Sequence, residues 1–265
     1  MILFPPAKIN LGLNVKSKRS DGYHEIETCM VEVPFHDVLE ILPSTKFKFI
    51  SSGMEIKGNV DDNLCVKAYR LLESEHNLPP VYIHLRKNIP MGAGLGGGSS
   101  DATYVLKGLN ELFDLELDKK ELERYASVLG SDCAFFVKGG SQIAIGRGEV
   151  LSDSDVDLKG KYLKLINPEI HIGTAEAYSN VVLDKGSSVH SVLQEPIENW
   201  QSRLNNSFES YAFSEHPEIK SLKDELIEDG AIYVAMSGSG SSVFGIYESE
   251  PKHSANYTLE WIVKL

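Results

Sequence analysis

Cysteine is scarce in this chain. Its 265 residues include three cysteines, Cys29, Cys65 and Cys133, which lie far apart and form no Cys-x-x-Cys pair. That pattern excludes a disulfide framework and a cysteine-based zinc site, and it is typical of reduced thiols. The sequence also lacks an apolar run long enough to cross a bilayer, and residues 1–13 lack the basic and apolar regions of a signal peptide. We therefore expect a cytoplasmic protein.

Positive charge is in deficit as well. The chain has 26 Lys+Arg against 38 Asp+Glu, which gives a formal net charge of -12. An acidic field of this size argues against nucleic-acid and membrane partners, but a small phosphorylated ligand meets a local site rather than the net charge. Hydrophobic residues make up 42% and charged residues 24% of the chain, which are values of a globular protein and not of a disordered one.

The hydrophobic pattern predicts a mixture of strands and helices. Alternation over 9–15 and 25–33 indicates strands, and apolar residues recur at helical spacing over 105–113. Asp118 and Glu121 form a capping-box pattern that opens a further helix, and Gly130 ends it. Asp62 is a candidate cap for a helix that includes residues 64–72, and Thr174 for a helix through Val182. Pro217 fits the first turn of a later helix that Gly230 closes. We detect no internal repeat, so this order predicts an α+β fold rather than strict β-α-β alternation.

One polar stretch is the best candidate for a domain boundary. Residues 152–161 are rich in charge and serine and contain few apolar side chains. At roughly 150 residues per domain, the length fits two modest domains. We therefore expect an N-terminal domain over 1–151, which carries the nucleotide loop and the catalytic residues, and a C-terminal domain over 152–265. The sequence leaves the oligomeric state open.

The most informative segment is a glycine-rich loop, PMGAGLGGGSSDA, between an expected strand at 81–85 and a helix expected near Ser99. Glycines let backbone N–H groups turn inward, and a helix N-terminus adds positive potential, so that the loop suits a phosphate group. Serine hydroxyls can add contacts to phosphate or to a metal ion. The candidate cofactor-binding residues are Pro90, Met91, Gly92, Ala93, Gly94, Leu95, Gly96, Gly97, Gly98, Ser99 and Ser100.

Three interpretations of this loop compete. A flexible surface turn is disfavoured, because so many glycines would cost conformational entropy without a return. A dinucleotide fingerprint fits Gly92, Gly94 and Gly97 literally, but Pro90 separates the strand from the glycines and clear β-α-β flanks are missing. A nucleoside-triphosphate loop is favoured, although no Gly-Lys-Ser/Thr follows, so the loop is not of the Walker A type.

The loop resembles the second motif of the GHMP kinases. PAKINLGL at 6–13 is similar to the first motif of that superfamily, and AMSGSGSSVFG at 235–245 is similar to the third. The third motif is a second glycine-rich turn, which in this superfamily supports the phosphate region. Three motifs in the same order span nearly the whole chain. The resemblance implies an ATP-dependent phosphotransferase that acts on an alcohol.

Further segments narrow the resemblance to one family. SDGYHEIET at 20–28, LGSDCAFF at 129–136, GRGE at 146–149 and NPEIHIGTAEAY at 167–178 are similar to the 4-diphosphocytidyl-2-C-methyl-D-erythritol kinases of the non-mevalonate isoprenoid pathway. That resemblance implies a two-domain GHMP kinase fold with the active site in the cleft between the domains. It also implies ATP and Mg²⁺ as cofactors, and a cytidine-diphosphate substrate phosphorylated on its 2-hydroxyl group.

The resemblance implies two catalytic residues. Asp132 lies in a loop after the expected helix end, where its carboxylate can accept the proton of the attacking hydroxyl group. Lys8 can lower the pKa of that hydroxyl group and neutralise charge on the transferred phosphoryl group. The residues alone also allow a capping or surface aspartate and a solvated lysine at a strand edge. Only the family pairs Lys8 with Asp132.

The resemblance also implies the substrate-binding residues. Tyr23 and Tyr178 can stack on the faces of cytosine, and His24 can bond its polar edge. Asn10 and Thr174 can bond the diphosphate or the erythritol hydroxyl groups. Taken singly, the aromatic residues also fit a turn that covers the core or an ordinary helix face.

Some residues depart from the family pattern or keep two interpretations. Asn63 can meet the adenine of ATP or cap its helix. Thr103 stands where an alanine is usual, and Ser207 replaces the acid of an Asn-Asp-Phe-Glu element. Alternative functions are a homoserine or mevalonate type of GHMP kinase and a nucleotide-binding regulator without turnover, whereas a dehydrogenase is remote. The metal ligands stay open.

Overall fold

Strands and helices alternate irregularly, as expected for an α+β fold. The computed structural model describes residues 1–184, 186–254 and 256–265. The strands are β1 Ile2–Leu3, β2 Pro6–Lys18, β3 His24–His36, β4 Val38–Pro43, β5 Lys48–Gly53, β6 Val81–Lys87, β7 Ser141–Gly146, β8 Val150–Asp153, β9 Tyr162–Ile166, β10 Tyr233–Met236, β11 Val243–Tyr247 and β12 Glu260–Lys264. The helices are α1 Leu64–His76, α2 Gly97–Leu112, α3 Lys119–Leu129, α4 Phe135–Lys138, α5 Thr174–Ser179, α6 Val189–Leu193, α7 Glu209–Glu215 and α8 Pro217–Glu228, with 3₁₀ turns η1 Val60–Asp62 and η2 Ile197–Ser202.

The chain forms two compact units that are interleaved in sequence. The first unit contains residues 1–7, 35–91 and 96–139, and the second contains 8–34, 92–95 and 140–265. The chain therefore crosses between the units several times, twice within the glycine-rich loop. The domain boundary expected between residues 151 and 152 stays a prediction.

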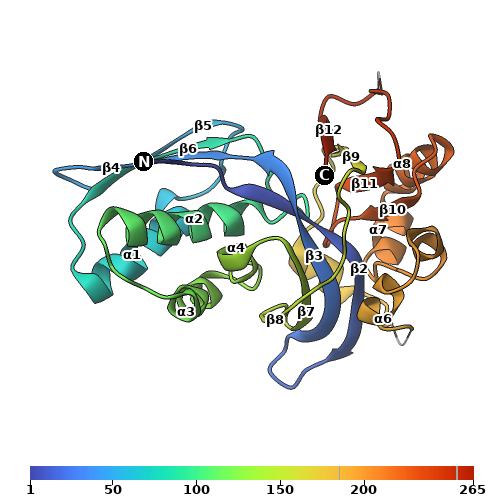
Figure 1. Cartoon of the computed structure of the whole chain (residues 1–265), viewed down its shortest axis with the longest axis horizontal. Helices are drawn as coiled ribbons and strands as arrows, with labels where there is room; N and C mark the ends of the chain where they lie inside the picture. The colour runs from blue at the N-terminus through green and yellow to red at the C-terminus, as the bar shows by residue number, and fades with distance from the viewer. Residues whose placement is uncertain (185, 255) are drawn as a thin grey trace. The chain divides into compact units, whose positions relative to one another are not determined.

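The first unit is a sheet with helices on one face (Figure 1). Its strand order is β1-β4-β6-β5, in which β5 runs parallel to β6 and the other pairs are antiparallel. Alternate residues of the two central strands are buried, as strand periodicity requires: Leu39, Ile41, Ile83 and Leu85. Helices α1 and α2 pack against each other. This packing supports helix α2, whose first residues belong to the glycine-rich loop.

The second unit contains two four-stranded sheets, in the orders β2-β3-β7-β8 and β10-β11-β9-β12. Helix α8 packs against β10 and β11 through Ile219, Leu222 and Leu226, which belong to one apolar cluster with Val234 and Met236. Residues Pro6 to Val15 of β2 are buried on both faces of the strand. The polar residues that alternate along β2 therefore lie inside the protein and not in solvent.

Local signals in the sequence place several helix ends correctly. The capping box of Asp118 and Glu121 opens α3, Gly130 ends it, and Pro217 occupies the first turn of α8. Two expectations are wrong. The cap of α1 is Asn63 and not Asp62, because the Asn63 side chain accepts a hydrogen bond from the backbone N–H of Cys65. This contact confirms the capping interpretation of Asn63.

The second error concerns α5. The expected cap, Thr174, is its first helical residue, and the cap position belongs to Gly173. The helix also ends at Ser179, short of the expected Val182.

Cys29, Cys65 and Cys133 are free thiols in the protein interior. Across the described ranges, the helices nowhere combine the length and the apolar character that a membrane span requires.

Candidate active site

The glycine-rich loop leads directly into helix α2. Gly96 is the N-cap residue of α2 in the left-handed conformation, and the helix begins at Gly97, slightly before the expected start near Ser99. The first backbone N–H groups of a helix lack partners within it and favour an anion at that end. Among the described residues, the buried hydroxyl group of Ser100 has no hydrogen-bond partner. A glycine-rich approach, an open helix end and an unpaired hydroxyl group fit a phosphate ligand.

The other part of the loop belongs to the second unit and packs on the third motif. A Cβ atom on Gly94 would lie 1.9 Å from the backbone oxygen of Ser237, and Gly94 has a φ of +77°. Only glycine fits this close approach of two backbones. The Ser237 hydroxyl group donates a hydrogen bond to the Gly94 oxygen at 2.8 Å. The two glycine-rich turns predicted from the sequence therefore contact each other.

Lys8 is buried beside this contact. Its side chain lies on β2 and is 3% exposed, which excludes a solvated lysine at a strand edge. The ammonium group donates hydrogen bonds to Oδ1 of Asn10 at 2.6 Å and to the backbone oxygen of Gly94 at 2.9 Å. Asn10 in turn donates from Nδ2 to the Thr28 hydroxyl group at 3.0 Å. Asn10, expected to bind substrate, thus holds the lysine that the family pattern marks as catalytic.

Asp132 lies in the turn between α3 and α4, as predicted from the helix stop at Gly130. It is half-buried. The Thr103 hydroxyl group, on α2, lies 2.8 Å from the backbone oxygen of Cys133 and ties this turn to the helix. Asp132 belongs to the first unit and Lys8 to the second, so the pairing of the two residues stays a prediction.

The expected cytosine-binding residues contact one another in part. The rings of His24 and Tyr178 are stacked with centroids 5.0 Å apart and an interplanar angle of 24°. Tyr178 also meets Phe208 edge to face. Tyr23 is 53% exposed and has the guanidinium group of Arg147 over its ring. Burial lowers the pKa of His24, and the nearby Lys18 charge lowers it further, so the imidazole is neutral at pH 7.

The remaining predicted residues lie on loops and helix ends. The exposed Thr174 hydroxyl group is 3.4 Å from that of Ser239, in the turn of the third motif. Asn206, in the element that departs from the family pattern, donates from Nδ2 to the backbone oxygens of Met236 at 2.7 Å and Gly238 at 2.8 Å. This element therefore holds the third motif in place, and Ser207 supports it by accepting a hydrogen bond from the backbone of Val15 at 2.9 Å.

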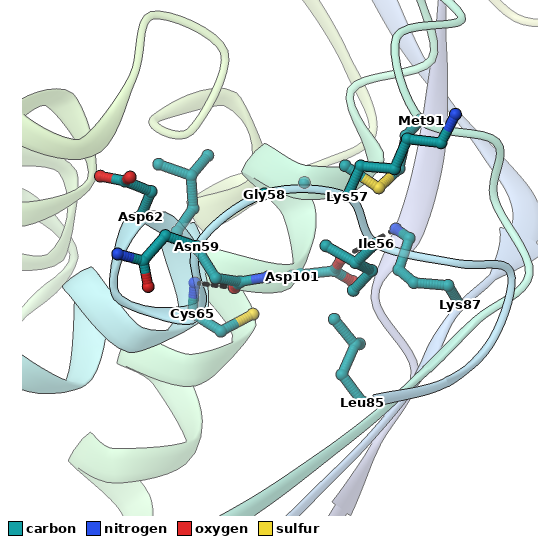
Figure 2. Close-up of a pocket in the computed structure, with 13 residues that line it drawn as sticks. Ile56, Lys57, Gly58, Asn59, Asp62, Cys65, Leu85, Lys87, Met91 and Asp101 are labelled. Carbon is teal, nitrogen blue, oxygen red and sulfur yellow. Dashed lines mark hydrogen bonds and ion pairs between the residues drawn. The ribbon is translucent and has the colours of Figure 1, made fainter. Parts of the chain in front are cut away.

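A pocket of about 250 Å³ lies in the first unit beside the start of α2. Its lining includes apolar side chains from separate segments, Ile56, Leu64 and Met91, and the capping residue Asn63. Figure 2 shows Lys87 and Asp101 facing each other in this lining. Sequence reasoning missed the pocket, because its residues come from distant parts of the chain and no single motif marks it.

A buried ionic cluster forms one side of the pocket. Lys87 donates to Oδ2 of Asp101 at 2.8 Å and also to Asp37, and the exposed fractions of the three side chains are 2%, 2% and 0%. Burial raises the pKa of Asp101, and the charge of Asp37 raises it as well. These two effects outweigh the lowering of the pKa by the Lys87 ammonium group, so that the pKa lies at about 8. Oδ1 of Asp101 has no hydrogen-bond partner in the described parts of the chain. The alternation along β6 is a signal for the burial of Lys87, because this residue falls on the same side of the strand as the buried apolar residues.

The residues fit a nucleoside triphosphate better than a preformed metal centre. The glycine cradle, the α2 N-terminus and the unpaired Ser100 hydroxyl group suit phosphate oxygens. Within the described residues, no three His, Cys, Asp or Glu side chains are grouped to hold a metal ion. Mg²⁺ in kinases is commonly held by phosphates with only one or two protein ligands, so the donor set is compatible with a metal that binds together with the nucleotide.

Comparisons with known proteins agree with these motifs. The model of the GHMP kinases N terminal domain matches residues 63–140, and that of the GHMP kinases C terminal domain matches residues 190–255. The chain is 49% identical to the 4-diphosphocytidyl-2-C-methyl-D-erythritol kinase of Cytophaga hutchinsonii over 254 residues, 95% of this chain and 94% of the relative. It is also 49% identical to the enzyme of that name from Bacteroides fragilis over 257 residues, with coverages of 95% and 94%.

Solved structures give the same grouping. A crystal structure of 4-(cytidine 5'-diphospho)-2C-methyl-D-erythritol kinase aligns with a TM-score of 0.81 and 34% identity, covering 94% of this chain and 91% of that one. The homoserine kinase of Cytophaga hutchinsonii aligns with a TM-score of 0.69 at 17% identity, over 94% and 85% of the two chains, which shows a common fold alone. The chain is therefore a kinase with a GHMP kinase fold, and it belongs to the 4-diphosphocytidyl-2-C-methyl-D-erythritol kinase family.

Proposed function

We propose that this kinase transfers the γ-phosphoryl group of ATP to the 2-hydroxyl group of 4-diphosphocytidyl-2-C-methyl-D-erythritol, in the non-mevalonate route to isoprenoid precursors. The observation that carries the proposal is the 49% identity, over 95% of the chain, to a relative named for that substrate. We further propose a cytoplasmic location and no nucleic-acid partner. The buried free thiols support the location, and the net charge of -12 argues against nucleic acid.

ATP binds at the start of helix α2 in this proposal. The apolar side chains of Ile56, Leu64 and Met91 suit the faces of an adenine ring, and Asn63 lies in the same pocket lining. The phosphates extend to the glycines and to the backbone N–H groups at the helix end, where Ser99 and Ser100 add hydroxyl groups. Mg²⁺ binds with the phosphates and neutralises part of their charge.

Asp132 and Lys8 carry the chemical step. The oxygen of the 2-hydroxyl group attacks the γ-phosphorus of ATP, and the Asp132 carboxylate accepts the proton of that hydroxyl group. The bond between the γ-phosphorus and the bridging oxygen breaks, and ADP leaves with that oxygen. The Lys8 ammonium group stabilises negative charge on the transferred phosphoryl group. Its hydrogen bonds to Asn10 and Gly94 support this role, because they fix the position of the charge before substrate binds.

The cytidyl group is recognised by aromatic side chains of the second unit. Cytosine stacks against Tyr23 and Tyr178. The polar edge of cytosine meets His24, whose ring is stacked on that of Tyr178. Thr174 contacts the diphosphate or the erythritol hydroxyl groups. A neutral His24 supports this assignment, because an uncharged imidazole has one donor and one acceptor nitrogen for the mixed edge of cytosine.

An assay of ADP release across four alcohols tests the proposal. The purified protein is given ATP and Mg²⁺ with the cytidine-diphosphate methylerythritol, mevalonate, homoserine or galactose. We expect turnover with the cytidyl substrate alone, and phosphorus NMR of the product should show a new phosphate monoester. Turnover with mevalonate or homoserine instead would assign the protein to a sister kinase, and binding of ATP with no turnover would indicate a regulator.

A further inference from the structure

The GRGE segment at 146–149 forms a tight turn between β7 and β8 that has no role in the proposed function. Gly146 has a φ of +73°, and a Cβ atom there would lie 3.0 Å from Oε2 of Glu149. The backbone N–H of Gly148 donates to the oxygen of Ile145 at 3.1 Å and closes the turn. The glycines therefore let the Glu149 carboxylate fold back over the turn that precedes it.

The Glu149 carboxylate accepts hydrogen bonds from both the backbone and the side chain of Arg147. The backbone N–H of Arg147 donates to Oε2 of Glu149 at 2.6 Å, and Nε of the guanidinium group donates to Oε1 at 3.3 Å. Burial raises the pKa of the Glu149 carboxyl group, but hydrogen bonds from its own backbone and from Arg147 outweigh burial and bring the pKa below its ordinary value. The carboxylate is therefore charged at neutral pH and restricts the directions that the guanidinium group can take.

The guanidinium group lies over the ring of Tyr23. Its carbon Cζ is 4.8 Å from the ring centroid, within the range of a cation–π contact. Within the loop that carries Tyr23, the backbone N–H of Tyr23 donates a hydrogen bond to Oδ1 of Asp21 at 3.1 Å. Since Arg147 covers one face of the ring, a planar ligand can stack only on the other face.

A carboxylate joins this loop to the GRGE turn. Glu25 accepts a hydrogen bond from the backbone N–H of Gly146 at 3.1 Å and another from Arg19 at 2.8 Å. Arg19 also bonds Asp21. The Glu25 carboxylate thus holds the turn and the SDGYHE loop together, independently of the contact between Arg147 and Tyr23.

We propose that Arg147 is a positioning residue for the cytidyl substrate: it covers one face of Tyr23, holds the ring in place and so directs the base to the opposite face. The inference rests on the proposed function, in which Tyr23 stacks on cytosine. Arg147 acts through Tyr23 and does not contact the reacting atoms. A direct ion pair between Arg147 and the substrate diphosphate is the rival role that the test has to separate.

The chain offers a matched control. Arg124 lies over the ring of Tyr125 on α3 at 4.3 Å, and its side chain is 61% exposed. Arg124→Ala removes a contact of the same kind that has no part in the proposed substrate site. Arg147→Lys serves as the conservative variant, because it keeps the cation but loses the planar group that Glu149 orients.

The test measures KM and kcat for the cytidyl substrate and for ATP in a set of variants. We expect Arg147→Ala to raise KM for the cytidyl substrate about twofold to fivefold, the range of an exposed cation–π contact, with kcat and the KM for ATP unchanged. Arg147→Lys should fall between that variant and the wild type, and Arg124→Ala should match the wild type. Titration with cytidine 5′-diphosphate should reproduce the loss of affinity without turnover.

A double-mutant cycle separates the two roles of Arg147. In a Tyr23→Leu background, Arg147→Ala should cause no further rise in KM, because the ring through which it acts is gone. An equal rise in that background would overturn the proposal in favour of a direct contact with the diphosphate, as would wild-type kinetics of Arg147→Ala. If the wild-type protein phosphorylates no cytidyl alcohol, the proposed function fails too, so the two failures are distinguishable.

Discussion

The Lys8 ammonium group donates to Oδ1 of Asn10, and the Thr28 hydroxyl group fixes which end of that amide faces the lysine. Thr28 gives its proton to the backbone oxygen of Gly12 at 2.5 Å. Its oxygen must therefore accept from Nδ2 of Asn10, which turns Oδ1 of Asn10 toward Lys8. A hydroxyl group thus orients the Asn10 amide, and the amide oxygen in turn orients the Lys8 ammonium group.

Asn10→Ala should lower kcat about tenfold and leave the KM for ATP nearly unchanged, because it removes one of the hydrogen bonds that orient the Lys8 ammonium group but keeps that group in place. Steady-state kinetics with both substrates provide the measurement. Asn14→Ala is the control, since Asn14 is equally buried on β2 but donates to the backbone oxygen of Ser187. A loss of kcat of the same size in both variants would show a general effect on the strand.

Lys8→Ala and Asp132→Asn should each lower kcat by about 10²-fold to 10⁴-fold or more while ATP still binds. In the proposed mechanism, Lys8→Ala removes the positive charge beside the transferred phosphoryl group, and Asp132→Asn removes the proton acceptor. Calorimetric titration with a non-hydrolysable ATP analogue, paired with the ADP-release assay, separates binding from chemistry. Turnover near the wild-type rate in either variant would contradict the assigned role.

Tyr178→Ala should raise KM for the cytidyl substrate far more than KM for ATP. The substitution removes a stacking surface and also frees the His24 ring that lies on it. Tyr211→Ala is a suitable control, because Tyr211 bonds Glu176 of the same helix α5 through its hydroxyl group. Equal effects on both substrates would count against a role of Tyr178 in binding the base.

Thr103→Val should lower kcat severalfold and destabilise the protein by about 1 kcal/mol, because the turn that carries Asp132 loses its hydroxyl contact at the Cys133 oxygen. Ser221→Ala, on α8, removes a hydroxyl group bonded to the backbone oxygen four residues earlier and is the matched control. Thermal unfolding and kcat are measured together. A variant that loses stability but keeps kcat would show that Thr103 does not position Asp132.

Asp101→Asn should change how stability depends on pH. With its pKa raised from 3.8 to about 8, the folded protein keeps the Asp101 proton between those pH values, whereas the unfolded chain releases it. The free energy of unfolding of the wild type should therefore fall as pH rises from about 5 to 8, relative to Asp101→Asn. Urea denaturation at both pH values measures this difference. Asp224→Asn, at a 52% exposed position, should give no such trend, and a flat difference for Asp101→Asn would refute the expectation.

The sequence predicts this fold and site where the signals are local. The capping box at Asp118, the stop at Gly130 and the start of α8 at Pro217 depend on a few neighbouring residues, and the structure has all three. The prediction of Asp62 as the cap of α1 is wrong, because Asp62 belongs to the 3₁₀ turn η1 that precedes the helix, and the N-cap residue is Asn63.

Features that depend on contacts between distant parts of the chain are harder to predict from the sequence. Alternation along β2 predicts a strand, but not that its polar side is buried, since one partner of the Lys8 ammonium group, the Gly94 oxygen, lies 86 residues away in the sequence. The pocket beside α2 and the buried ionic cluster of Lys87, Asp37 and Asp101 are also hard to predict from the sequence. Their residues are distant in the sequence and come together only when the sheet and the pair of helices have formed. The motifs identified the loops and not the network that holds them.

The contact of Gly94 with Ser237 also has a consequence for the order of assembly. The loop that begins the proposed nucleotide site rests on a turn more than 140 residues further along the chain, which leaves the ribosome well after the loop itself. A nascent chain that stops before β10 has the glycines but not the surface that shapes them. Nucleotide binding should therefore appear late in folding, after a closure of high contact order, and not when the first motif and the loop have emerged.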